Sequence, residues 1–109
     1  MNTREQRVQM AAVHMQDAMQ SAISDGTRAS AAFDAGYTWL LVALDSPTGQ
    51  AHPTVEAIQS GISRLGVNTE TMAIAQEYLK RRYASEGSGD MLAGLLDWAR
   101  DMQVKAGET

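Results

Sequence analysis

Cysteine is absent from the 109 residues of this chain. Its absence excludes disulfide bonds, thiolate nucleophiles and cysteine-ligated zinc, and it is typical of a cytoplasmic protein. Histidine occurs only twice, on different predicted segments, without the spacing of a helical zinc site. There is also no phosphate-binding loop, dinucleotide fingerprint or nucleophile elbow. The sequence therefore predicts no metal and no cofactor.

Long apolar runs and alternating strand patterns are also missing. The longest apolar run, Trp39 to Leu44, is far shorter than the roughly 20 residues of a membrane span. The amino-terminal MNTREQRVQM has no apolar signal core, so we expect a cytoplasmic protein without a membrane partner. Only two prolines occur, and Val and Ile never alternate with polar residues, which favours helices over strands.

The charge balance is mildly acidic, with a formal net charge of −4. This value argues against a broad phosphate-binding surface, so nucleic acid is not an expected partner. The apolar fraction of 44% and the charged fraction of 20% are ordinary for globular proteins. The length suits one domain with its own core, and we assign residues 1–109 to a single helical domain.

The stretch from Thr27 to Leu44, TRASAAFDAGYTWLLVAL, has the most complete apolar pattern of the predicted helices. At 100° per residue its apolar side chains surround most of the helix, including Phe33, Tyr37 and Leu40. A helix that is apolar nearly all round lies inside a bundle, because a surface helix needs only a stripe. We therefore expect this segment to be the buried central helix.

Four further amphipathic segments complete a five-helix, antiparallel, all-α bundle. We expect the first helix to end before Asp25-Gly26 and the third to begin at Pro53 after a turn at Asp45–Gly49. Asn68 should cap the fourth helix. The four segments cover residues 3–24, 53–65, 69–84 and 90–104.

Arg7 and His14 are the only candidates for catalysis. They lie seven residues apart and so share one helix face at the margin of the apolar stripe. Such a pair suits a metal-independent ribonuclease, in which Arg binds phosphate and His transfers a proton. The competing interpretation is that both are polar residues at the rim of an amphipathic helix.

Asp34, Tyr37 and Thr38 mark a candidate small-ligand site. Asp34 is the one carboxylate inside the central helix, and Thr38 follows it one turn later. If a neighbouring helix covers this polar strip, Asp34 needs a partner such as Arg28 or Arg82. Otherwise the strip is where the inner helix meets solvent.

The segment Lys80-Arg81-Arg82-Tyr83 has two interpretations. Its cations could bind a phosphate while Tyr83 or Tyr78 stacks on a base. Cations are also expected in the last turn of a helix, where they complement the helix dipole.

Two pairs of apolar residues lie outside the main stripes of their helices. They are Met10 with Val13, and Ile74 with Tyr78. Singly exposed apolar residues are normal, so Met10 with Val13 is either a minor surface patch or half of a subunit contact. Ile74 with Tyr78 forms a second apolar strip on the flank of its helix. Together they motivate the hypothesis that the chain forms a homo-oligomer or binds a partner protein.

The segment MAAVHMQDAMQSAISDGTRASAAFDAGYTWLLVAL resembles the first two helices of HEPN domains. Members of that family commonly have a long first helix, a short Asp-Gly break, and a second helix in which small residues precede aromatics. HEPN ribonucleases carry a closely spaced Arg and His on a late helix, whereas no histidine follows His52 here. The resemblance thus implies a non-catalytic member, often a dimer. We predict a non-catalytic binding or regulatory module, with the ribonuclease and the small-ligand bundle as alternatives.

Overall fold

A computed structural model describes residues 3–44, 55–84 and 87–107. Within these ranges the chain forms five α-helices, one short 3-10 turn and no strand, which confirms the all-α fold. None of the helices in these ranges has the length and apolar character needed to cross a membrane. The elements are α1 (Thr3–Ala18), α2 (Asp25–Ala43), α3 (Val55–Leu65), α4 (Thr69–Tyr83), η1 (Gly89–Met91) and α5 (Leu92–Lys105).

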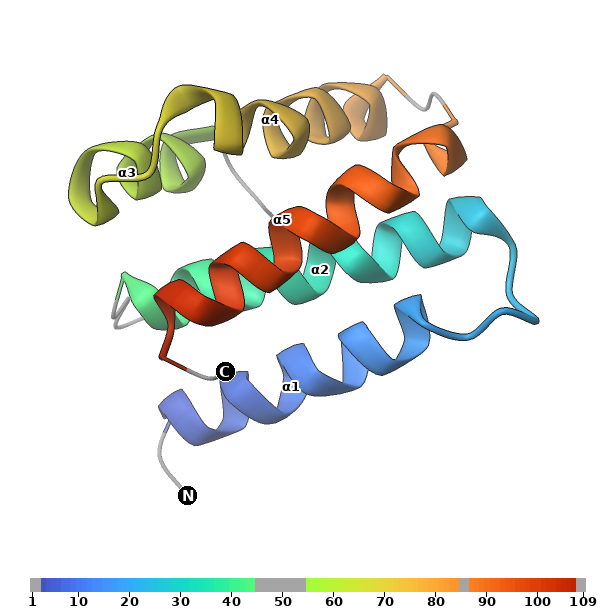
Figure 1. The fold of residues 1–109 in the computed structure, drawn as a ribbon, viewed down its shortest axis with the longest axis horizontal. Coiled ribbons are helices and arrows are strands. Elements are labelled where there is room, and N and C mark those ends of the chain that lie inside the picture. The colour runs from blue at the N-terminus through green and yellow to red at the C-terminus, as the bar shows by residue number, and fades with distance from the viewer. Residues whose placement is uncertain (1–2, 45–54, 85–86, 108–109) are drawn as a thin grey trace.

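Helix α2 occupies the centre of the bundle, as predicted (Figure 1). It packs extensively against α1 on one side and α5 on the other. Phe33 and Leu40 are fully buried and Tyr37 is 5% exposed. The apolar side chains surround this helix because neighbours cover most of its circumference.

The aromatic side chains of three helices stack around Phe33. The ring centroid of Phe33 lies 4.5 Å from that of Tyr78 on α4 and 5.5 Å from that of Trp98 on α5. It lies 5.9 Å from the ring centroid of Tyr37 on α2. Offset aromatic stacking adds to the free energy gained from burying apolar area. Phe33 therefore connects α2 to both α4 and α5 at a single point.

Helices α1 and α2 form an antiparallel hairpin, and α5 lies along α2 (Figure 1). Helices α3 and α4 follow one another along another side of the bundle. Helix α5 runs in the same direction as α2, and their starts lie together, with Gly89 next to Asp25. The last turn of α5 consequently lies near the start of α1, where Arg4 Nη2 donates to the carbonyl of Ala106 at 2.9 Å.

The predicted boundary between the first two helices is wrong. Helix α1 ends at Ala18 rather than Ser24, and Asp25 and Gly26 belong to the first turn of α2. Ser24 is the cap of α2, since its hydroxyl accepts from the Thr27 amide at 3.3 Å. A serine side chain that accepts from a free amide of the first turn favours the start of a helix at that point.

The other ends are close to the prediction. Gly66 ends α3 with φ of 68°, and the Asn68 side chain caps α4 by accepting from the Thr71 amide at 2.7 Å. Helix α4 ends one residue before the predicted Ala84, and the 3-10 turn η1 leads into α5. The predicted turn at Asp45–Gly49 and the start at Pro53 lie outside the described residues.

Candidate functional site

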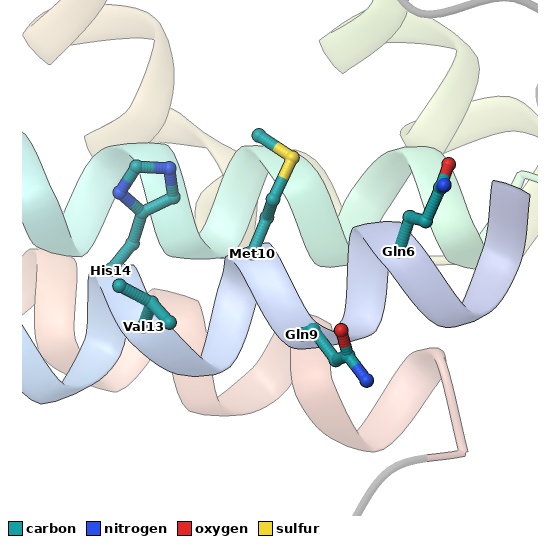
Figure 2. A pocket seen from close by; sticks show the side chains of 5 residues that line it. All are labelled: Gln6, Gln9, Met10, Val13 and His14. Atoms are coloured by element: carbon teal, nitrogen blue, oxygen red, sulfur yellow. The ribbon is translucent and has the colours of Figure 1, made fainter. Parts of the chain in front are cut away.

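The outward side of α1 carries two large apolar side chains that are exposed to solvent. Met10 is 54% exposed and Val13 is 56% exposed. Together with Gln6, Gln9 and His14 they line an open, mainly apolar hollow of about 410 Å³ (Figure 2). We call these five residues the α1 face.

The α1 face exists because α1 has apolar residues on two sides. Its inner side packs on α2 through Ala11 and Ala18, which are fully buried, and through the partly buried Val8 and Met15. Met10 lies on the other side. Figure 2 shows Gln6, Met10 and His14 along one edge of the helix, with Gln9 and Val13 along the next. The packing of α1 on α2 leaves Met10 and Val13 exposed.

Charge is missing from this side of α1. Between Gln6 and Gln16 the exposed positions hold glutamine, methionine, alanine and valine only. The cores of protein–protein interfaces are depleted of charged residues and enriched in methionine. Because long exposed helices ordinarily carry charged residues on their outer faces, this composition favours a covered surface.

The structure does not bring Arg7 and His14 together in an open site. Arg7 is buried, with 8% of its surface exposed, whereas His14 is half-buried and lines the hollow. The guanidinium of Arg7 is not among the groups that line this hollow. A ribonuclease needs both side chains within reach of one phosphate, and of the two only His14 lines the hollow. The other histidine, His52, lies outside the described residues.

The three candidate ligand residues on α2 contact the protein itself. Asp34 pairs with Arg82 of α4 at 3.3 Å, one of the two partners predicted for it. The Thr38 hydroxyl donates to the backbone carbonyl of Asp34 at 2.7 Å. Tyr37 is buried against Phe33. The ion pair of Asp34 therefore joins this polar strip of α2 to α4.

The basic end of α4 is also used within the fold. Arg81 Nη1 lies 2.8 Å from Asp90 Oδ1, and Arg81 Nε lies 3.4 Å from Glu77. The hydrogen bond to Asp90 raises the pKa of Arg81 above its ordinary value. With Arg82 paired to Asp34, two of the three consecutive cations bind carboxylates of this chain. This pairing supports the helix-end interpretation over a phosphate site.

The second apolar pair lies in a different environment from the one expected. Tyr78 is 4% exposed and stacks on Phe33, so its side chain is unavailable to a partner. Ile74 is half-buried and packs beside Gly94 of α5. The strip predicted as part of an interface is therefore packed within the fold, Tyr78 against α2 and Ile74 against α5. Met10 and Val13 remain as the candidate interface.

A second hollow, of about 340 Å³, was not identified from the sequence. It lies between the α3–α4 turn at Gly66–Asn68 and the end of α5 at Asp101 and Lys105. The two segments are distant along the chain and meet only in the folded molecule. Its lining is mixed rather than apolar, and it includes the exposed Val104.

Neither metal ligands nor known proteins add to this picture. Among the described residues no group of three or more His, Asp or Glu side chains is placed to hold a metal ion. A scan against protein-family models and searches of curated proteins and of solved structures found no match. A function for this protein is therefore inferred from the α1 face itself.

Proposed function

We propose that this protein is a non-catalytic helical module that associates with a second copy of itself through the α1 face. The observation that carries the proposal is the exposure of Met10 and Val13 within residues 6–16 of α1, where no exposed position holds a charged side chain. Burying this surface releases it from water at about 25 cal/mol per Å² of apolar area. A second copy of the chain presents the same surface and needs no further partner.

The placement of the cations supports a protein partner over nucleic acid or membrane. Arg28 and Arg64 donate to the backbone carbonyls of Ala18 and Leu44, and Arg81 and Arg82 bind carboxylates. These side chains stabilise the fold. The α1 face itself contains no lysine or arginine. A surface that binds phosphate backbones or anionic lipids requires such cations.

The resemblance to HEPN domains also supports pairing of two copies. A long first helix that pairs with a second helix rich in small residues is the feature on which the resemblance rests. The resemblance implies a non-catalytic dimer that pairs through helices. The α1 face gives this implication a specific surface on the first of those helices.

Sedimentation equilibrium of the wild-type chain tests the proposal directly. We expect the average mass to rise with protein concentration from 11.8 kDa toward twice that value. The rise should occur in the micromolar range, because the face is small and association must offset the loss of rotational and translational freedom. A mass that stays at that of one chain throughout this range would contradict the proposal.

A further inference from the structure

The exposed side of α1 has the spacing of a helix–helix seam. Gln6, Met10, Val13 and Asp17 are all exposed and follow one another at intervals of four, three and four residues. This is the spacing of the a and d positions through which two helices of a coiled coil pack together. The apolar pair lies in the middle of these four residues, the α1 seam, and a polar side chain lies at each end.

We infer that two copies pair through the α1 seam in antiparallel orientation; this inference rests on the self-association proposed above. A two-fold axis between residues 11 and 12 sets Met10 against the partner's Val13, and Val13 against the partner's Met10. The same axis sets Gln6 against the partner's Asp17 at both ends. The seam is then complementary to itself, as a two-fold interface requires.

Charge distinguishes the antiparallel from the parallel arrangement. In a parallel pair the two Asp17 carboxylates lie against each other, and bringing like charges together in a partly dry interface is unfavourable. In the antiparallel pair each carboxylate meets the Gln6 amide of the partner, which has two N–H donors. Within the described residues Asp17 forms no ion pair, so its carboxylate is available for this contact. The opposed helix dipoles favour the same arrangement.

Disulfide trapping measures the relative orientation of the two α1 helices. Because the chain has no cysteine of its own, only the introduced cysteines can form a disulfide. Full-length Gln6→Cys and Asp17→Cys variants are prepared, one with a mass tag, and are oxidised separately and as a mixture. Antiparallel pairing predicts a disulfide mainly between the two different variants. Two copies of position 6 lie eleven residues apart along the seam, about 16 Å, which is too far for a disulfide.

Each other outcome has a definite meaning. Efficient disulfides within the Gln6→Cys sample alone, or within the Asp17→Cys sample alone, would overturn the antiparallel orientation. Absence of any trapped product together with a wild-type dimer would show that another surface pairs. A wild-type chain that stays monomeric in sedimentation would instead remove the proposed function itself.

A charge variant provides an independent reading that needs no oxidation. Gln6→Lys places an ammonium beside the partner's Asp17 in the antiparallel pair, and we expect the dimer Kd to fall a few-fold at low salt. In a parallel pair the same substitution sets two ammonium groups against each other and raises the Kd. A raised Kd would therefore overturn the inference.

Discussion

Single residues show how closely α2 and its neighbours approach. Gly36 has no side chain, and a Cβ built there would overlap the six-membered ring of Trp98. Trp98 itself is 2% exposed, and its indole N–H contacts the sulfur of Met72 at 3.3 Å. The ring is held on both sides, so it has little room to move. The glycine at this helical position is explained by packing.

Substitution of Gly36 by alanine should destabilise the protein. Alanine is favoured over glycine in a helix by about 1 kcal/mol. Overpacking a core costs about 1–3 kcal/mol, so we expect a net loss of up to about 2 kcal/mol in the free energy of unfolding. Urea titration followed by circular dichroism measures this change.

Gly26 supplies the matched control for that experiment. It lies in the first turn of the same helix, and a Cβ built there meets nothing within 4 Å. Gly26→Ala should therefore stabilise the protein slightly, by about 0.5 kcal/mol. Equal effects of the two substitutions would mean that Trp98 does not pack against Gly36.

At the scale of helices, arginines connect the end of one element to another. The guanidinium of Arg28 donates to Ala18 at the end of α1 over 2.8 Å, and that of Arg64 donates to Leu44 at the end of α2 over 3.1 Å. Arg4 does the same for Ala106 at the end of α5. The last carbonyls of a helix have no partner within it, and a cation complements the dipole there. These bonds fix where each helix stops relative to its neighbours.

Arg28 provides the test at this scale. Its side chain is 19% exposed, and Arg28→Ala should lower the free energy of unfolding by about 1–3 kcal/mol, because the Ala18 carbonyl loses a charged donor. Arg100→Ala is the control, since Arg100 is 52% exposed and pairs only loosely with Asp97, at 3.7 Å. We expect its effect to stay within about 0.5 kcal/mol. Thermal unfolding of both variants checks the difference.

The sequence is informative about elements where one local signal dominates. The apolar surround of Phe33, Tyr37 and Leu40 predicts a central helix because no other position in a small bundle covers all sides. The end of α1 is not predictable in the same way. Ala22 and Ile23 continue the apolar spacing past Ala18, and only the capping contact of Ser24 shows where α2 begins. Two local signals compete there, and the tertiary structure decides between them.

The candidate surface, like the helix boundaries, is only partly predictable from the sequence. Helical period alone places Met10 and Val13 away from the inner stripe of α1, and the structure leaves both exposed. Period alone also places Ile74 and Tyr78 beside the main stripe of α4. Their burial depends on the position of α5 and of Phe33, which local patterns along α4 do not contain.

At the scale of the whole molecule, the residues that hold the fold together lie apart from the α1 face. The core residues and the arginine contacts that hold the helices together lie on the inner sides of the bundle or at helix ends. The α1 face lies outside them, so changes there should alter the oligomeric state while leaving the fold intact. The exposed apolar side chains of the described residues allow a direct comparison, because Val13 and Val104 are both 56% exposed on different helices.

The most direct test is therefore light scattering of the wild type, Val13→Glu and Val104→Glu at one concentration above the dimer Kd. The account predicts a mass of twice 11.8 kDa for the wild type and Val104→Glu, and of 11.8 kDa for Val13→Glu, which brings an uncompensated carboxylate into the seam. Circular dichroism should show all three equally helical. A Val13→Glu protein that remains dimeric, or a Val104→Glu protein that dissociates to the same degree, would contradict the account.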